Sequence, residues 1–366
     1  MSSLETKAIR HMYQHVPSKF FQFAFGTLHP HIKYQHNWSI DVLGEALARC
    51  HGRETTRLII NMPPRSLKSI CTSVAFPAWV LGVQPESKIM CVAGHRGLAT
   101  EHHELTRNLM THPRYRSLFP HIRVQESTGT LKFAQGGFRD ALTPSGSITG
   151  RGANMIIIDD PQSAHEADDP QKSSTICNWY DRNIQQRLNC KHDGVIIVVM
   201  QRLAEDDLTG HLLKQEGWEL LNLPAIATQD EWLPKSLGGH LARNKGEALH
   251  PARENRDQLR ETMERIGARP FMSQYQQEPY PKGKGEGRGG AFHFTPHPDA
   301  TEEECISHST FFNFFKEEFF VLDRVFGERT GFRPGPAPAM TEEQWVEKYS
   351  KIKQASSIPL DEQCSR

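Results

Sequence analysis

The feature that most constrains this fold is the stretch RLIINMPPRSLKS, which runs from Arg57 to Ser69. A short run of Leu and Ile, a Pro-Pro turn and a Lys-Ser pair before a second apolar run predict a strand, a phosphate loop and a helix. A triphosphate needs converging backbone N–H groups, the positive end of a helix, an ammonium group and a hydroxyl group for Mg²⁺. Lys68 and Ser69 supply the last two, so the stretch predicts a nucleotide site.

The predicted loop departs from the common pattern G-x-x-x-x-G-K-[ST] at both glycines, which are replaced by Met62 and Leu67. A positive φ at Leu67 would be strained, because its Cβ atom clashes where a glycine has none. We therefore expect the loop to hold phosphate along a different backbone path. A surface loop with an incidental Lys-Ser pair is the alternative interpretation.

Two adjacent acids, Asp159 and Asp160, follow the apolar run 155–158. The run predicts a strand buried on both faces, and open parallel sheets bind ligands at the carboxyl ends of such strands. Burying two acids is costly unless a cation or a proton transfer requires them. We expect Asp159 to hold Mg²⁺ through water and Asp160 to position or deprotonate the attacking water. An Asp-Asp helix cap is the alternative.

A third buried strand, 194–200, ends in the polar pair Gln201 and Arg202. We expect this pair to lie close to the nucleotide and to report whether the γ-phosphate is present; a structural arginine at a strand end is the alternative. Asp206 and Asp207 follow, and acids at that point suit the start of another helix.

Strands and helices alternate along the chain, which predicts a parallel sheet. The fold class is therefore α/β, with a mostly parallel sheet flanked by helices, and the family resemblance given below implies that it is an ASCE-type P-loop NTPase. We expect a buried helix at 70–81, a strand at 88–94, a polar helix at 97–111, a hairpin around 135–137 and a helix at 170–188. His102 and His103 are adjacent in the polar helix and cannot share a face, so we expect both to be solvated.

The chain divides by composition into four predicted regions. Residues 1–50 are expected to form helices that pack on the nucleotide domain, which spans 51–225. Residues 226–290 form a linker or subdomain that ends in a basic, glycine-rich stretch from Pro279 to Gly290, where the charge gives solubility or contacts DNA. Residues 291–366 are a poorly defined C-terminal appendage.

Charge and cysteine usage limit the function classes. Lys and Arg total 43 and Asp and Glu total 43, so any basic face that binds nucleic acid must be local. The seven cysteines form no C-x-x-C pair, which is typical of reduced, cytosolic proteins. No run reaches the roughly 18 apolar residues of a membrane span, and the N-terminus has no signal-peptide pattern.

The three strand-end signals, in this order, resemble the large subunit of tailed-bacteriophage terminases, the ATP-driven DNA-packaging motors. The resemblance covers about residues 35 to 280 and depends on five stretches: HNWSID at 36–41, IINMPPRSLKS at 59–69, GRGAN running into IIDDP between 150 and 161, QRLAEDDL at 201–208 and FMSQYQQEP at 271–279. The family's glycine is replaced by Leu67.

The resemblance implies that ATP and Mg²⁺ are the cofactors. It implies that Lys68 and Ser69 bind phosphate and Mg²⁺ and that Asp159 and Asp160 are the Walker B pair. Arg65 would stabilise charge in the transition state, and Gln201-Arg202 would couple hydrolysis to movement. The phosphate loop implied by the match comprises Pro64, Arg65, Ser66, Leu67, Lys68 and Ser69.

The resemblance also implies double-stranded DNA, the portal protein and the small terminase subunit as partners, with a homo-oligomeric ring as the assembly and no membrane. Such a motor acts in the cytoplasm of a bacterial host, transiently at the procapsid portal. The family's second domain is an RNase H-like nuclease with two metals held by several carboxylates. Fewer than 90 residues follow the linker, and Asp323 alone resembles a metal-binding acid, so we expect the nuclease to be absent or truncated.

Two further functions are compatible with these motifs. A noncatalytic prophage remnant or assembly protein would keep the fold without turnover, and the replacement of glycine by Leu67 favours it. Another P-loop enzyme, such as a helicase, would share the phosphate loop. A kinase would need a lid that binds the acceptor, and no segment indicates one.

Overall fold

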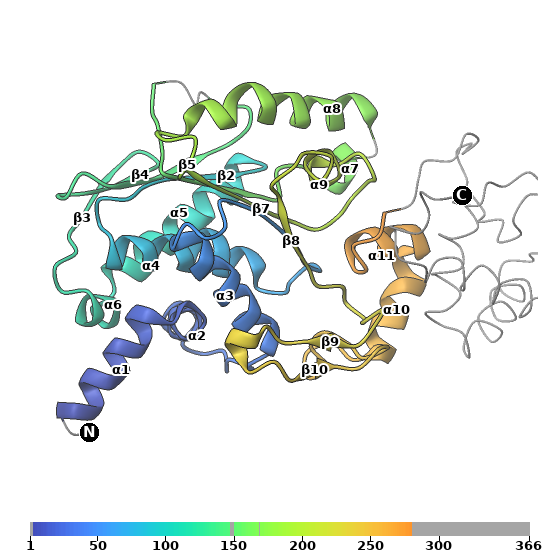
Figure 1. The fold of residues 1–366 in the computed structure, drawn as a ribbon, viewed down its shortest axis with the longest axis horizontal. Helices are drawn as coiled ribbons and strands as arrows, with labels where there is room; N and C mark the ends of the chain where they lie inside the picture. The colour runs from blue at the N-terminus through green and yellow to red at the C-terminus, as the bar shows by residue number, and fades with distance from the viewer. Residues whose placement is uncertain (1–2, 147–149, 168, 280–366) are drawn as a thin grey trace, which may run out of the picture. The chain divides into compact units, whose positions relative to one another are not determined.

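Eight strands form the central sheet of the computed structural model, in the order β3-β4-β5-β2-β6-β7-β1-β8 (Figure 1). Their bounds are β1 Arg57–Asn61, β2 Lys88–Ala93, β3 Val124–Ser127, β4 Thr130–Phe133, β5 Phe138–Leu142, β6 Met155–Asp159, β7 Val195–Met200 and β8 Glu219–Asn222. The five pairings from β5 through to β8 are parallel, and the β3-β4-β5 edge is antiparallel. The predicted α/β class and the hairpin around 135–137 are confirmed.

The structure describes residues 3–146, 150–167 and 169–279, and these belong to one unit that extends to Pro281. Three sequence predictions lie outside the described residues: the basic stretch beyond 279, the C-terminal appendage and the acid at Asp323.

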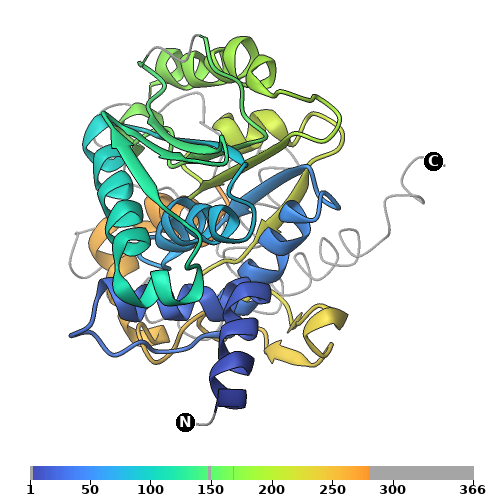
Figure 2. The ribbon, with the colours of Figure 1, turned by 90° about the vertical axis from the view of Figure 1, so that its left-hand side faces the viewer.

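The helices of the described residues cover both faces of the sheet (Figures 1 and 2). Their bounds are α1 Ser3–His15, α2 Pro17–Leu28, α3 Trp38–His51, the π-helix η1 Ile70–Ala75, α4 Phe76–Val83, α5 Arg96–Thr111, α6 Pro113–Leu118, α7 Ala164–Ala167, α8 Pro170–Trp179, the π-helix η2 Tyr180–Ile184, the 3₁₀ turn η3 Gln185–Arg187, α9 Leu208–Leu212, the 3₁₀ turn η4 Lys235–Leu237, α10 Arg256–Ile266 and α11 Ala268–Gln274.

Side chains of the central strands alternate between two apolar cores. On one face, Ile89 of β2 and Ile157 of β6 join the core formed with α2, α3, η1 and α4. On the other face, Ile158 of β6 and Val198 of β7 join the core formed with η2 and α9. All five residues of β6 are buried, as the apolar run predicts for a strand covered on both faces. The same alternation directs Asp159 toward the face covered by η1 and α5.

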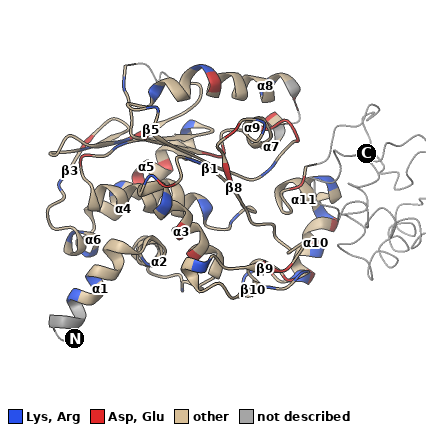
Figure 3. Ribbon diagram, in the orientation of Figure 1, with Lys and Arg blue, Asp and Glu red and all other residues tan. Residues whose placement is uncertain are grey.

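β7 has no charged residue, and in β1, β2 and β6 the single charged residue is at a strand end, at Arg57, Lys88 and Asp159 (Figure 3). Beyond β8, a two-stranded ribbon of β9 (Glu231–Trp232) and β10 (Leu241–Arg243) precedes α10 and α11. None of the described helices combines the length and the apolar character of a membrane span.

The predicted helices are present with shifted bounds. The expected helix at 70–81 begins as a π-helix and continues as α4, and the expected helix at 170–188 changes from α8 to a π-helix at Tyr180. One expectation about α5 is wrong: His102 and His103 are both buried, at 4% and 5% exposure. The two side chains point in different directions from α5, and both directions are covered by protein. α5 packs on the sheet, with η1 on one side and the edge that contains β3 and β5 on the other.

Candidate nucleotide site

The candidate site lies where three neighbouring parallel strands end. β7 lies between β6 and β1, so the carboxyl ends of all three strands meet at one edge of the sheet. The loop 62–69 leaves β1, Asp159 and Asp160 leave β6, and Gln201 leaves β7. This is the edge at which parallel sheets bind ligands.

The loop and the two acids are in direct contact. The Lys68 Nζ atom lies 3.3 Å from Asp160 Oδ2, and the Ser69 hydroxyl donates a hydrogen bond of 3.0 Å to Asp159 Oδ1. Lys68 is only 5% exposed and Asp159 only 1%. The ammonium and hydroxyl groups that the sequence assigns to phosphate and Mg²⁺ therefore face the two carboxylates.

The loop backbone differs from the expected path. Leu67 has a φ of +65° and Arg65 a φ of +57°, so the loop takes the left-handed conformation that we expected Leu67 to exclude. The expectation was wrong because it weighed the local strain alone, whereas the Leu67 side chain packs against the main core. Loops with left-handed residues form anion-binding concavities of backbone N–H groups, so the strained path is compatible with phosphate binding.

A glycine after β2 makes room for the acidic turn. A Cβ atom added at Gly94 would lie 2.3 Å from the carbonyl oxygen of Asp160, which is closer than any side chain tolerates. Asp160 itself has a positive φ of 38°, so the main chain turns sharply as it leaves β6. Gly94 therefore allows this turn, a requirement that the sequence did not reveal.

The Asp159 carboxylate is held from three sides. Ser73 donates a hydrogen bond of 2.6 Å to Oδ2, and His102 Nδ1 lies 3.6 Å from the same oxygen. Burial and, to a smaller extent, the Asp160 charge raise the pKa of Asp159 to about 7, against the opposing effects of the Ser73 and Ser69 hydroxyls and the Lys68 charge. A buried carboxylate with a raised pKa gains stability from a cation.

Mg²⁺ fits the donors of this site. The Ser69 hydroxyl and the Asp159 carboxylate present oxygen atoms 3.0 Å apart, and Mg²⁺ binds through a few oxygen ligands while it keeps several waters. In the part of the chain that the structure describes, no group of three or more His, Cys, Asp or Glu side chains could hold a metal ion. The donor set therefore suits a metal that takes its other ligands from phosphate and water.

Sequence reasoning missed Ser73 and His102. Ser73 follows Ser69 by four residues, a spacing that places two hydroxyls on one helical face, and this signal was available. His102 belongs to α5 and reaches Asp159 only through the packing of the helix on the sheet. Burial, together with the smaller effects of the Arg139 and His95 charges, lowers the pKa of His102 to about 4, so the imidazole is neutral at pH 7.

Gln201 reaches the site, whereas Arg202 is engaged elsewhere. The backbone N–H of Gln201 donates to Asp160 Oδ1 at 3.2 Å. The Arg202 guanidinium contacts the fully buried Asp207 at 3.0 Å and donates to the carbonyl of Ala204. The pair Arg202–Asp207 thus organises the turn after β7, as the structural alternative expects, and a role of Arg202 toward the nucleotide stays a prediction.

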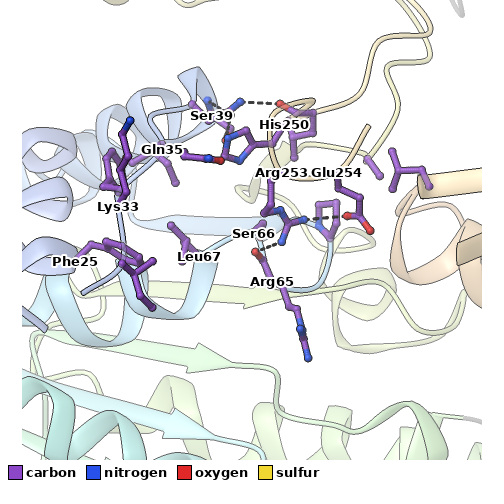
Figure 4. A pocket seen from close by; sticks show the side chains of 18 residues that line it. Phe25, Lys33, Gln35, Ser39, Arg65, Ser66, Leu67, His250, Arg253 and Glu254 are labelled. Carbon is purple, nitrogen blue, oxygen red and sulfur yellow. Dashed lines mark hydrogen bonds and ion pairs between the residues drawn. The ribbon is translucent and has the colours of Figure 1, made fainter. Parts of the chain in front are cut away.

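A cavity of about 340 Å³ lies against the outer side of the phosphate loop (Figure 4). Its apolar walls include Phe25, Leu67 and Leu249. Three polar atoms of residues that line it are buried and have no hydrogen-bond partner among the described residues, namely Tyr34 Oη, Ser66 Oγ and His250 Nε2. Buried polar atoms are rarely left unpaired, so the cavity is suited to a ligand that carries both an apolar face and polar edges.

Two contacts join the walls of this cavity. The Asn37 side chain caps α3 through the N–H of Ser39 and donates to the carbonyl of Leu249 at 2.8 Å. The Arg253 guanidinium donates to the carbonyl of Arg65 in the phosphate loop. The Arg65 side chain itself is exposed and points away from the cavity (Figure 4), which leaves it free to meet phosphate oxygens or a second molecule.

No family model matches this chain, and no curated protein matches it. Several solved structures that are similar to it are large terminases of bacteriophages. One is the HK97 bacteriophage large terminase, with a TM-score of 0.43 and 14% sequence identity. The match covers 70% of this chain and 55% of the HK97 chain. A mutant ATPase domain of the Thermus phage P74-26 large terminase has a TM-score of 0.47 and 14% identity, over 70% of this chain and 98% of that one. The large terminase of a thermophilic bacteriophage in complex with ADP has a TM-score of 0.32 and 14% identity, over 49% of this chain and 44% of that one.

Proposed function

We propose that this chain binds ATP with Mg²⁺ and hydrolyses it, and that it is the motor subunit of a phage or prophage terminase. The observation that carries the hydrolase proposal is the meeting of Lys68 and Ser69 with Asp159 and Asp160 at one edge of the sheet. One group suited to binding phosphate, two suited to holding a metal and one suited to accepting a proton meet there through two direct contacts.

Each group has a defined task in the proposed reaction. Lys68 neutralises the outer phosphates, Ser69 and Asp159 hold the metal, and Asp160 orients the attacking water or accepts its proton. When bound with the nucleotide, Mg²⁺ neutralises the charge that develops on the phosphate oxygens. Because Lys68 pairs with Asp160, nucleotide binding exchanges this ion pair for contacts with phosphate.

We further propose that the base of the nucleotide occupies the cavity beside the loop. Its volume of about 340 Å³ and its apolar walls suit a planar heterocycle, and its unpaired polar atoms from Tyr34, Ser66 and His250 suit the polar edges of a purine. Because Ser66 and Leu67 line this cavity next to Lys68, the base and the phosphates would bind on two sides of one loop.

A more specific part of the proposal concerns the DNA that the motor moves and the proteins with which it assembles. The motifs between residues 35 and 280 support translocation of double-stranded DNA into a capsid, together with a portal protein and a small terminase subunit, by a ring of identical chains in the bacterial cytoplasm.

ATP hydrolysis by the purified chain, with and without double-stranded DNA, tests the proposal. Lys68→Ala should reduce the rate to background and weaken nucleotide binding, because it removes the cation that faces the phosphates. Lys132→Ala, which removes an exposed lysine from β4, is the matched control and should retain the wild-type rate.

Two results would contradict the motor. Equal rates for wild type and Lys68→Ala, with and without DNA, would show that the chain has no turnover of its own. If the wild type still bound ATP in a manner that depends on Lys68, the noncatalytic remnant would be the correct function. Hydrolysis that single-stranded DNA stimulates more than double-stranded DNA would instead support a helicase.

A further inference from the structure

The Asp159 carboxylate receives two hydroxyl groups from one helical face. Ser69 donates to Oδ1 at 3.0 Å and Ser73 donates to Oδ2 at 2.6 Å. In the proposed metal site Ser69 turns its oxygen to Mg²⁺, whereas Ser73 is one helical turn further from the loop and keeps its bond to Asp159. Ser73 is therefore the hydroxyl group that can hold the carboxylate while the metal binds.

The main chain at Ser73 is irregular. The helix after the phosphate loop starts as a π-helix, Ile70–Ala75, in which Phe76 donates to the carbonyl of Cys71 five residues before it. Pro77 has no N–H group, so the carbonyl of Ser73, four residues earlier, lacks the donor that an α-helix would supply. Single π-helical turns are often found at functional sites.

Arg139 of β5 supplies a donor to this carbonyl. Its Nη2 atom donates to the Ser73 carbonyl oxygen at 3.1 Å. Arg139 has 0% exposure, and its Nε and Nη1 atoms have no hydrogen-bond partner among the described residues. Burying a guanidinium group with two unpaired nitrogens costs free energy. A buried arginine of this kind is therefore unusual in a strand and needs an explanation.

We infer that Arg139 and Ser73 form a positioning pair behind the metal carboxylate: Arg139 fixes the main chain of Ser73, and the Ser73 hydroxyl fixes the orientation of Asp159. With Oδ2 held by Ser73, Oδ1 would stay directed at the Ser69 hydroxyl, and these two oxygens would hold the metal directly or through water. This inference rests on the proposed function, because it assigns both residues to the same Mg²⁺ site. Neither residue belongs to the phosphate loop or lines the cavity beside it, so both would act through Asp159.

The test measures metal affinity directly. Mn²⁺ binding to the ADP complex of the full chain is followed by the EPR signal of free Mn²⁺, and ADP binding is measured separately in the presence of EDTA. Ser73→Ala should weaken Mn²⁺ binding about 10-fold or more, the range found when a residue behind a metal ligand is lost. The affinity for ADP without metal should stay within about 2-fold of the wild type.

The matched control is Thr106→Val in α5. Thr106 is also fully buried, and its hydroxyl donates to the carbonyl of His102 four residues earlier, but it does not contact Asp159. Thr106→Val should therefore bind Mn²⁺ within about 2-fold of the wild type. An equal loss in Ser73→Ala and Thr106→Val would overturn the inference, because any buried hydroxyl would then have the same effect.

A double-mutant cycle tests the link to Arg139. Arg139→Met should weaken Mn²⁺ binding as Ser73→Ala does, and the double variant should lose no more than either single one, because both remove the same support. Arg139→Lys keeps a cationic donor and should retain most of the affinity, which provides a second variant if Arg139→Met does not fold. Additive losses would exclude Arg139 from the pair.

Failure of the inference and failure of the proposed function give different results. Mn²⁺ affinity in Ser73→Ala within about 2-fold of wild type, with normal ADP binding, overturns the positioning pair and leaves the nucleotide site standing. No ADP binding by the wild type overturns the proposed function and the inference with it.

Discussion

Leu67 is the residue at which backbone strain and core packing oppose each other. The left-handed conformation costs an L-residue about 1–2 kcal/mol, and Leu67 adopts it with a φ of +65°. Its side chain is half-buried and contacts the main core, and that burial offsets the strain. A phosphate loop can therefore be built without glycine where the neighbouring core gives a side chain a place to pack.

The balance between strain and packing at Leu67 predicts that a glycine variant is more stable than an alanine variant, the reverse of the usual order. Leu67→Gly loses the packing but also the strain, whereas Leu67→Ala loses the packing and keeps the strain, so we expect the glycine variant to be more stable by about 1 kcal/mol. Leu221 of β8 also packs half-buried on this core but has no positive φ, and there alanine should be more stable than glycine. Urea unfolding of the four variants measures both differences. The same order at both positions would contradict the strain at Leu67.

His102 predicts a dependence of stability on pH. Its pKa in the folded chain is lowered to about 4, below the ordinary 6.5, mainly by burial. Between pH 6.5 and 4 the unfolded chain therefore binds a proton that the folded chain does not, so acidification favours unfolding through this group. The stability is present above pH 6.5 and is lost progressively as the pH falls to 4.

His102→Gln removes this loss. We expect the wild type to lose about 3 kcal/mol more than His102→Gln between about pH 7 and pH 4 in metal-free buffer, from a pKa difference of about 2.5. The raised pKa of Asp159 acts in the opposite direction in both proteins, so the difference between their curves reports His102 together with its contact to Asp159. His192→Gln, at a side chain that is 95% exposed, is the control and should follow the wild type. Parallel curves for wild type and His102→Gln would show that the pKa of His102 does not differ between the folded and the unfolded chain.

At the scale of elements, the turn between β7 and α9 is organised by one carboxylate. Asp207 is fully buried and accepts hydrogen bonds from the N–H groups of Leu203 and Gly210 and from the Arg202 guanidinium. It thereby caps α9 and fixes the segment that carries Gln201 toward Asp160. The adjacent Asp206 is exposed, so only one acid of this pair anchors the turn through its side chain.

This arrangement predicts a large difference between two neighbouring substitutions. Asp207→Asn should lower the free energy of unfolding by about 3 kcal/mol, because it removes a buried charge that Arg202 requires and replaces an acceptor with a donor. Asp206→Asn should change the free energy by less than about 0.5 kcal/mol. Chemical denaturation at neutral pH measures both. A loss of equal size in the two variants would assign the effect to helix-dipole electrostatics instead of the buried network.

At the scale of the whole molecule, residues 1–281 form a unit with its own cores on both faces of the sheet. A chain ending at Pro281 should therefore fold cooperatively and bind ADP with the affinity of the full chain, because every described residue of the candidate site lies within it. Thermal unfolding with and without ADP checks this, and a truncated chain that aggregates or shows no shift with ADP would contradict it.

The sequence alone determined the parts of the site that depend on local order. The strand-loop-helix at 57–69, the strand before Asp159 and the polar end of β7 follow from short apolar runs and the residues that close them, and parallel strands bring such ends to one edge. The α/β class follows from the same alternation. Each of these features depends on residues that are close together in the sequence, so the sequence alone is enough to predict them.

Only the tertiary structure decided the left-handed backbone of Leu67, the burial of His102, the support of Ser73 by Arg139 and the cavity between segments near residues 34 and 250. Each depends on contacts between segments that are far apart in the chain, and packing at those contacts overrides what the local residues prefer. A local sequence pattern does not show which distant side chains will pack against its residues. The sequence therefore predicted the chemical groups of the site but not the tertiary contacts that hold these groups in place.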